Sequence, residues 1–484
     1  MNQTTLPDAA QKVVAERFRQ DRIERWDREA PARAARFYHD SLARLYRSLV
    51  PPGQRVLELG CGDGDLLAAL APSLGVGIDF SPKRIETASA RHPGLRFIAA
   101  DVHEFLPDGQ FDYVIFSDLV NDLWDVQVVF ERIAAICSPT TRVIINSYSR
   151  LWELPLAMAR RLRLANPRLG QNWLTVEDLS NLLYLAGFEV IRRWPEILFP
   201  IRIPVVATTF NRYLVRLPPF RFAALSNFMI ARRSPSVAAA AGQNGDPMVS
   251  VIVPARNEAG NIAEIVRRIP RMGRETEIVF VEGHSHDDTC RVIEETIAQH
   301  PDLRCKLLRQ TGEGKGDAVR AGFAAADGEI LMILDADLSV APEDLPRFYR
   351  ALRSGMGEFA NGVRLVYPME GKAMRFINLV GNKFFSWAFS WLLGQRLKDT
   401  LCGTKALGRH HYREIAQNRG YFGEFDPFGD FDLIFGAARL NLKLVDIPIR
   451  YHERTYGTTN IRRWKHGWLL VKMVLFALRR IKFV

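Results

Sequence analysis

The 484-residue sequence is poor in cysteine and has no long apolar run. Its five cysteines are scattered and form no CxxC pair, which argues against a disulfide framework or a zinc site. No stretch approaches the roughly 20 uncharged apolar residues that span a bilayer. The N-terminus also lacks the apolar segment of a secretory signal. We therefore expect a cytoplasmic protein without a transmembrane segment.

Acidic residues are outnumbered by basic ones. Lys and Arg total 65 and Asp and Glu total 54, which gives a formal net charge of +11. This excess favours an anionic partner, such as nucleic acid, an anionic membrane or a phosphorylated substrate. A nucleic-acid reader would carry a recognition motif, and none is visible, so no nucleic-acid partner is expected. The sequence indicates nothing about the oligomeric state.

The chain is about three times as long as the ~150 residues typical of one domain. Small residues, two Gly and two Pro make residues 234–247 a predicted linker between domains at 1–233 and 248–484. On both sides of this linker, strand-like apolar runs alternate with helical segments, which is typical of parallel sheets with crossover helices. The expected fold class is therefore α/β, with two domains in series.

The first half contains a glycine-rich turn between a predicted strand and a predicted helix. Gly60, Gly62 and Gly64 lie in the segment RVLELGCGDG, where glycines allow a sharp turn and close approach to a ligand. Asp79 ends the next strand, at the distance where an acidic residue accepts hydrogen bonds from ribose hydroxyls. Asp101 ends a third strand. We expect these strand ends to share one edge of the sheet.

With Glu58 included, the pattern resembles the class I S-adenosylmethionine-dependent methyltransferases over roughly residues 35–195. The resemblance implies a Rossmann-like sheet and S-adenosylmethionine as cofactor. The cofactor-binding residues that it implies are Glu58, Gly60, Gly62 and Gly64 beside the methionine part, Asp79 at the ribose, and Asp101 with Val102 at the adenine. A plain NAD site is a weaker alternative. The methyl acceptor stays unknown.

Two other features of the first half are ambiguous. Asp118, Asn121 and Asp122 follow the fourth predicted strand on the expected acceptor side, but a solvated helix start explains them equally well. A basic, apolar tail runs from residue 195 to residue 233. This tail could cover the acceptor site, contact a membrane or pack between domains.

The second half contains a predicted buried strand that ends in Asp335 and Asp337. Side chains two apart on a strand point the same way, so we expect both carboxylates to bind one hard divalent cation, which in turn holds a diphosphate. Polar residues also follow the first two predicted strands of this half, at 254–258 and 282–289, and open a helix at 314–318. Their order predicts one nucleotide site.

Residues 248–465 resemble the family 2 glycosyltransferases with a GT-A fold, and most closely the polyprenyl- or dolichyl-phosphate sugar synthases. The resemblance implies Mg²⁺ or Mn²⁺ on Asp335 and Asp337. Family members commonly carry DDGS where this chain has Glu282 followed by Gly, His and Ser, so the choice between UDP and GDP donors is open. The donor-binding residues expected from the likeness are Pro254, Arg256, Glu258, Glu282, Lys315 and the phosphate-neutralising Arg454.

The acceptor decides whether a catalytic base is needed. A lipid phosphate is already an anion, whereas a sugar hydroxyl must lose a proton, for which Asp430 is the candidate base beside the catalytic Asp337. Two aromatic segments with basic fringes, 376–397 and 464–483, are predicted to rest on a membrane surface or to pack in the protein.

We therefore predict a bifunctional enzyme at the inner face of the membrane, with inverting sugar transfer from a nucleotide sugar to a polyprenyl phosphate. The alternative is transfer to a glycan or glycolipid hydroxyl beside a methyltransferase-like docking module.

Overall fold

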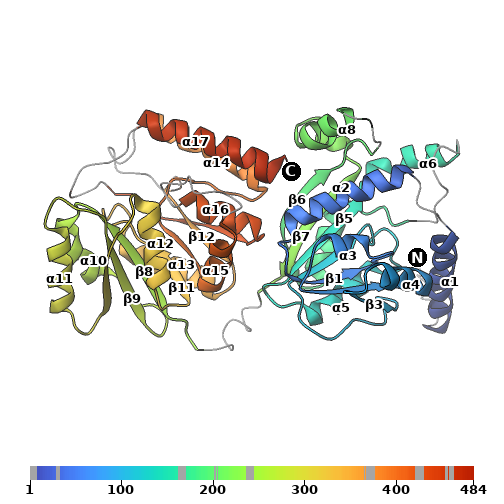
Figure 1. The fold of residues 1–484 in the computed structure, drawn as a ribbon, viewed down its shortest axis with the longest axis horizontal. Coiled ribbons are helices and arrows are strands. Elements are labelled where there is room, and N and C mark those ends of the chain that lie inside the picture. Colours follow the sequence, from blue (N-terminus) through green and yellow to red (C-terminus); the bar gives the residue numbers. More distant parts are fainter. Residues whose placement is uncertain are drawn as a thin grey trace, which may run out of the picture. The chain divides into compact units, whose positions relative to one another are not determined.

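The computed structural model describes residues 8–28, 33–161, 171–200, 203, 205–235, 245–364, 366, 376–419, 430–452, 456 and 463–483. The chain divides into two compact units (Figure 1). The first comprises Met1–Ser234 with Phe483–Val484, and the second comprises Pro235–Lys482. Each unit has its own sheet and its own core, and each is described by itself.

The N-terminal unit is built on a seven-stranded sheet in the order β3-β2-β1-β4-β5-β7-β6. The first five strands are parallel, whereas β7 pairs antiparallel with both of its neighbours. The sheet is therefore mixed, and the expectation of a parallel sheet holds only for β1 to β5. The strands are β1 (Arg55–Leu59), β2 (Leu74–Asp79), β3 (Arg96–Ala99), β4 (Tyr113–Ser117), β5 (Arg142–Tyr148), β6 (Phe188–Glu196) and β7 (Ser226–Arg233).

Local signals explain where several helices of this unit begin. Ser81 accepts a hydrogen bond from the backbone N–H of Arg84, and Thr175 forms a capping box with Asp178. Apolar side chains of the helices and strands then form two cores, one on each face of the sheet. The helices are α1 (Asp8–Arg28), α2 (Arg33–Leu49), α3 (Asp65–Ala69), α4 (Pro82–Arg91), α5 (Val126–Ile136), α6 (Glu153–Arg161), α7 (Val176–Leu185) and α8 (Val206–Thr208).

The segment expected to be a basic, apolar tail has two structural parts. Short helical turns follow β6: η2 (Thr209–Tyr213), η3 (Leu214–Arg216) and η4 (Phe220–Ala223). The last eight residues form β7, an inner strand between β5 and β6. The tail is therefore in part a component of the sheet, because the apolar run from Phe228 to Ala231 is buried there.

The C-terminal unit also has a mixed seven-stranded sheet, in the order β10-β9-β8-β11-β13-β12-β14. β8 lies between β9 and β11, parallel to both, whereas β13 is antiparallel to β11 and β12. The strands are β8 (Val249–Ala255), β9 (Thr276–Glu282), β10 (Arg304–Arg309), β11 (Ile330–Ile333), β12 (Phe359–Val363), β13 (Lys405–Gly408) and β14 (Leu444–Pro448).

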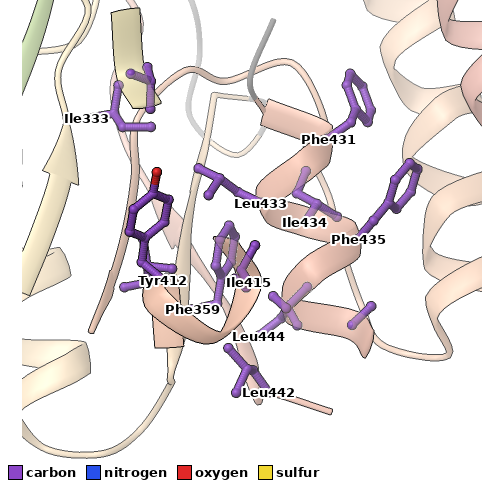
Figure 2. Packing of buried hydrophobic residues seen from close by; sticks show 14 of the residues in the cluster. Ile333, Phe359, Tyr412, Ile415, Phe431, Leu433, Ile434, Phe435, Leu442 and Leu444 are labelled. Carbon is purple, nitrogen blue, oxygen red and sulfur yellow. The ribbon is translucent and has the colours of Figure 1, made fainter. Parts of the chain in front are cut away.

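Helices cover this sheet and bury its apolar faces. Figure 2 shows part of one core, where Phe431 and Phe435 of α16 and Tyr412 of α15 lie among buried aliphatic side chains. Phe389 of α14 adds a ring 5.2 Å from Phe431. The helices are α10 (Ile262–Arg268), α11 (Thr289–Gln299), α12 (Lys315–Ala325), α13 (Leu345–Arg353), α14 (Phe376–Leu393), α15 (Arg409–Gln417), α16 (Asp430–Arg439) and α17 (Arg463–Ala477).

Both aromatic segments expected at a membrane contain a helix, α14 and α17. Within the part of the chain that the structure describes, no helix combines the length and the apolar character needed to cross a bilayer.

Candidate functional site

The glycine-rich turn of the N-terminal unit lies between β1 and α3. Gly60, Gly62 and Gly64 all have positive φ angles, which favour glycine. A Cβ on Gly64 would lie 2.6 Å from the ring of Phe97, so this position also needs the absence of a side chain. Around Gly62, by contrast, the space is open. The turn can therefore admit a ligand at its middle glycine.

Glu58 of β1 lies beneath this turn and is 2% exposed. Burial raises its pKa well above the ordinary value, and the nearby Asp79 carboxylate raises it further. Its Oε2 atom has no hydrogen-bond partner among the described residues. A buried acceptor of this kind beside an open glycine turn fits a ligand with donor groups, as the amino end of S-adenosylmethionine has.

Asp79 follows on the neighbouring strand and fixes the turn. Its Oδ2 accepts a hydrogen bond from the backbone N–H of Gly62 at 3.0 Å, and its Oδ1 accepts one from Ser81 at 2.9 Å. Burial raises its pKa despite these two hydrogen bonds. Both oxygens already have backbone partners, so Asp79 orders the loop on which a ribose would lie.

Asp101 and Val102 lie beyond β3. Val102 is buried, and Asp101 accepts hydrogen bonds from the backbone and the Nδ1 atom of His103 at 2.9 and 2.7 Å. Burial would raise the pKa of Asp101, but the bonds to His103 lower it below the ordinary value. The structure thus brings all the predicted cofactor residues to the carboxyl edge of β1, β2 and β3.

Helix α1 also reaches this edge, which the sequence alone did not indicate. Arg19 lies 3.9 Å from Asp101, and Arg22, which is almost fully buried, lies 3.6 Å from Asp122. Phe18 and Trp124 form an edge-to-face ring pair. The sequence shows a helical segment with arginines at positions 19 and 22. Their acidic partners lie about 80 to 100 positions further along the chain, so no local pattern connects them.

The residues after β4 form a polar cluster. Asp118 has a φ of +56°, which is unusual for a residue with a side chain. Its Oδ1 accepts hydrogen bonds from Tyr38 at 2.9 Å and from Asn146 at 2.5 Å. Leu119 packs directly against Gly60, so Asp118 lies beside the glycine turn.

Asn121 is fully buried and holds a neighbouring loop. Its amide donates to the carbonyl of Asn172 at 2.7 Å and accepts from the backbone N–H of Tyr148 at 3.1 Å. Asn121 therefore has a structural role, and it is not the solvated helix cap that was one explanation of its position.

In the C-terminal unit, Lys315 and Asp335 form the centre of the candidate site. Nζ of Lys315, at the start of α12, lies 2.6 Å from Oδ1 of Asp335, and both side chains are 28% exposed. Burial would raise the pKa of Asp335, but the charge of Lys315, with Lys405 and Arg364 further off, lowers it. A Cβ at residue 403 would collide with both groups, so Gly403 permits the backbone to approach the pair.

Asp337 lies in the turn after β11. The strand ends at Ile333, so the expected alternation along a strand does not determine the directions of Asp335 and Asp337. Oδ1 of Asp337 accepts hydrogen bonds from the N–H and the hydroxyl of Ser339 at 3.0 and 2.7 Å. The carboxylate oxygens of Asp335 and Asp337 are hard donors, so these two residues fit a divalent ion that also takes substrate phosphate oxygens. The ammonium group of Lys315 contacts the Oδ1 atom of Asp335.

The described residues contain no group of three His, Cys, Asp or Glu side chains arranged to hold a metal ion. In the loop after β9, the ring of His284 contacts the carbonyl of Gly312 through its Nε2 atom.

Predicted donor-binding residues lie at the carboxyl ends of β8 and β9. Pro254 is in β8, Arg256 is exposed, and Glu258 is buried and accepts a hydrogen bond from Asn261 at 2.8 Å. Glu282 ends β9 and accepts from the backbone N–H of Ser285 at 2.6 Å. These residues and Asp335 lie at the ends of adjacent parallel strands.

Gln310 is a residue of this edge that the sequence reasoning missed. It is buried just after β10, and its amide donates to the carbonyl of Gly314 at 2.8 Å and to Asp317 at 3.0 Å. These bonds hold the loop that presents Lys315. A polar residue directly after the run CKLLR was the available signal.

Arg364 and Asp399 form a buried ion pair near the site. The guanidinium donates two hydrogen bonds to the carboxylate, at 2.7 and 2.8 Å. Burial would raise the pKa of Asp399, but Arg364 lowers it to about 2. Lys405 is also fully buried, and its Nζ contacts the carbonyl of Cys402. The positive charges of Lys405 and Arg364 thus both act on Asp335, while Asp399 pairs with Arg364.

Other predicted site residues lie outside what the structure describes. These are Arg454 and the side chain of Asp430, whose backbone begins α16.

Comparisons with known proteins assign the two parts of the chain to two families. Residues 26–193 match the family described as "Methyltransferase domain", and residues 250–414 match the family described as "Glycosyl transferase family 2". The chain therefore carries a methyltransferase domain followed by a family 2 glycosyltransferase domain, which confirms both family resemblances.

Curated relatives match less than half of the chain. An undecaprenyl-phosphate 4-deoxy-4-formamido-L-arabinose transferase of Klebsiella pneumoniae is 26% identical over 213 residues, which are 43% of this chain and 61% of the relative. The chain thus spans about three fifths of that relative's length. An undecaprenyl-phosphate mannosyltransferase of Micrococcus luteus is 29% identical over 241 residues, 48% of this chain and 94% of the relative.

Among solved structures, a glucosyl-3-phosphoglycerate synthase from Mycobacterium tuberculosis, in complex with Mn²⁺, uridine diphosphate and glucosyl-3-phosphoglycerate, is 20% identical. The alignment covers 51% of this chain and 83% of that chain, with a TM-score of 0.36.

Proposed function

We propose that the C-terminal unit transfers a sugar from a nucleotide diphosphate to a polyprenyl phosphate, with inversion at the anomeric carbon. The observation that carries this proposal is the contact of Lys315 with Asp335, next to Asp337, at the end of a central strand. The printed names of two relatives, both of which act on undecaprenyl phosphate, support the choice of acceptor.

In this proposal Asp335 and Asp337 hold Mg²⁺ or Mn²⁺, and the cation neutralises the departing diphosphate. Lys315 contributes a second positive charge at the same place. The donor occupies the strand ends around Pro254, Arg256, Glu258 and Glu282, and Arg454 neutralises phosphate. An acceptor that is already an anion needs only to be positioned, so no base is required.

We further propose that the N-terminal unit binds S-adenosylmethionine and transfers its methyl group. The orphaned Oε2 of Glu58 beside the open Gly62 supports a ligand there. Gly60 and Gly64 shape the turn, Asp79 holds the ribose side, and Asp101 with Val102 borders the adenine. The sulfonium is already activated, so alignment of the acceptor supplies much of the rate.

The proposed domain limits are 1–233 and 248–484, with residues 234–247 as the linker. The proposed location is the inner face of the membrane, where the aromatic, basic segments around α14 and α17 rest against lipid headgroups. A polyprenyl acceptor would be presented there.

The experiment measures transfer of radiolabelled sugar from UDP and GDP donors, with Mg²⁺ or Mn²⁺, into an organic-extractable polyprenyl phosphate fraction. We expect lipid label that the Asp337→Ala variant loses while its circular dichroism and melting temperature stay unchanged. Normal turnover in that variant would contradict the proposal.

Label in a glycan or glycolipid, together with its loss in Asp430→Asn, would instead favour a hydroxyl acceptor with Asp430 as base. In that case S-adenosylmethionine binding without methyl transfer would make the N-terminal unit a docking module.

A further inference from the structure

The N-terminal unit exposes large apolar side chains on two neighbouring segments. Leu154 and Met158 of α6 are 75% and 64% exposed, and Phe222 of η4 is 62% exposed. Such a concentration on one region is unusual for surface that meets only water. In Figure 1, α6 and α8, which opens the second segment, both lie at the upper edge of this unit.

Hydrogen bonds join the two segments although about 70 residues of sequence separate them. The indole N–H of Trp152 donates to the carbonyl of Ala223 at 3.0 Å, and the backbone N–H of Ser149 donates to the carbonyl of Leu225 at 2.7 Å. Trp152 and Leu225 also share one apolar cluster. The exposed side chains therefore belong to one surface, here named the α6–η4 surface. Its exposed apolar members are Leu151, Leu154, Met158, Leu217, Phe220 and Phe222.

The charge within the two segments has one dominant sign, although Asp178 of α7, whose pKa is lowered mainly by hydrogen bonds from Thr175, lies near enough to Arg150 for this arginine to lower that pKa further. The sequence contains no Asp or Glu between Glu196 and Asp246, and Glu153 is the one acidic residue between Arg150 and Arg161. Arg150, Arg161, Arg212 and Arg221 are exposed. Positive charge beside exposed apolar groups is complementary to a lipid bilayer with anionic headgroups above an apolar interior.

The position of Arg221 fits binding to such a bilayer. The guanidinium of Arg221 lies over the ring of the neighbouring Phe222, 5.4 Å from its centroid. This arrangement keeps the charge beside the aromatic ring at the level of the surface. A ring that enters a bilayer interface would therefore carry its arginine to the depth of the lipid phosphates.

We propose that the α6–η4 surface binds the anionic face of a lipid bilayer, so that the methyltransferase unit has its own membrane contact. The aliphatic and aromatic side chains enter the interface, and the arginines pair with lipid phosphates. This contact is separate from the sugar-transfer site and does not depend on its activity.

The test uses the full chain with Cys290 and Cys305 replaced by Ser, so that one introduced cysteine carries the environment-sensitive dye NBD. Leu154→Cys and Phe222→Cys report on the surface, and Glu86→Cys on the exposed face of α4 is the label control. With vesicles of phosphatidylcholine and phosphatidylglycerol, we expect a blue shift and brighter emission at positions 154 and 222 but not at 86. The label reports its own site, so lipid binding by other parts of the chain does not imitate the result.

Vesicle flotation provides a second measurement. The double variant Leu154→Ser/Phe222→Ser should bind anionic vesicles roughly five- to tenfold more weakly. The matched control is Tyr184→Ser/Leu185→Ser, which removes two other exposed large side chains from α7, the helix that begins with Glu177 and Asp178 in its first turn. It should bind as the parent does.

Equal emission at positions 154, 222 and 86 in the presence of anionic vesicles would overturn the proposal. So would a dye response that occurs only when a second protein is added, because the surface would then be a protein interface. A response equal in pure phosphatidylcholine would remove the role of the arginines and would likewise contradict it.

Discussion

Nζ of Lys315 lies 2.6 Å from Oδ1 of Asp335, and Gly403 leaves the space that this pair needs. The contact joins the first residue of α12 to the turn after β11. The ammonium group of Lys315 is thereby held next to a carboxylate that, in the proposed function, also binds the divalent cation. The contact therefore connects a residue proposed to face the diphosphate with a residue proposed to bind the metal ion.

A double-mutant cycle should show that Lys315 and Asp335 act together. We expect Lys315→Met and Asp335→Asn each to lower the rate of sugar transfer roughly 100-fold or more, because each removes a charge that faces the diphosphate. The double variant should lose less than the product of the two effects, since groups in contact are not additive. Asp302→Asn, at an exposed position, is the control. Losses that multiply would show that the two side chains act independently.

Gly403→Ala should separate function from folding. The new methyl group would collide with the side chains of Lys315 and Asp335, so the pair must shift. Misplacement of about 1 Å near reacting groups can cost roughly 100-fold in rate, and we expect a loss of that order with a melting temperature close to that of the parent. Gly381→Ala in α14, where a Cβ meets nothing within 4 Å, is the matched control and should keep full activity.

Acid should destabilise the C-terminal unit through Asp399. Its pKa is about 2 in the folded protein and about 3.9 in an unfolded chain. A depressed carboxylate pKa stabilises the fold above the unfolded value, and this contribution is lost as the pH falls from about 4 towards 2. The expected loss is about 2 to 3 kcal/mol. Denaturant unfolding measured across this range should show it.

Asp399→Asn is the informative variant for that titration. It leaves the buried Arg364 without its carboxylate, so it should lower the stability at neutral pH by about 3 to 5 kcal/mol. Its remaining stability should depend less on pH between 4 and 2 than that of the parent. An unchanged pH dependence would mean that another group causes the acid sensitivity.

The contribution of Glu58 to stability should depend on pH in the opposite direction to that of Asp399. Burial raises its pKa in the folded state, so the stability it contributes is complete below the unfolded pKa and is lost as the pH rises through the folded value. Glu58→Gln removes this dependence, and we expect the N-terminal unit to melt at a higher temperature than the parent at pH 8. Calorimetric titration should show weaker S-adenosylmethionine binding. A variant that binds the cofactor equally well would exclude Glu58 as a cofactor contact.

Sequence reasoning identified most of the strands that form the two sites. Runs such as RVLEL and VSVIVP are apolar because their strands are buried on both faces, and this buried character is visible without a structure. β7 was missed because its apolar run lies inside a basic segment and its partners are β5 and β6. No local pattern specifies an antiparallel strand inserted between two earlier ones.

The sites were predictable only in part, for the same reason. Gly60, Gly62, Gly64 and Asp79 form a local motif, and the structure brings them together as expected. The partners supplied by α1 and by Gln310 depend on contacts between distant segments. The direction of Asp337 was also inferred from a strand that ends four residues earlier.

The position of β7 affects how the protein can be divided and how it emerges from the ribosome. β6 contacts the rest of the sheet through β7, whose residues are the last to be synthesised before the second unit begins. A nascent chain that stops at residue 225 lacks the inner strand and leaves the edge of β5 open. A fragment of the first unit should therefore end after residue 233. A shorter fragment would expose the unpaired edge of β5, which could pair with other chains and cause aggregation.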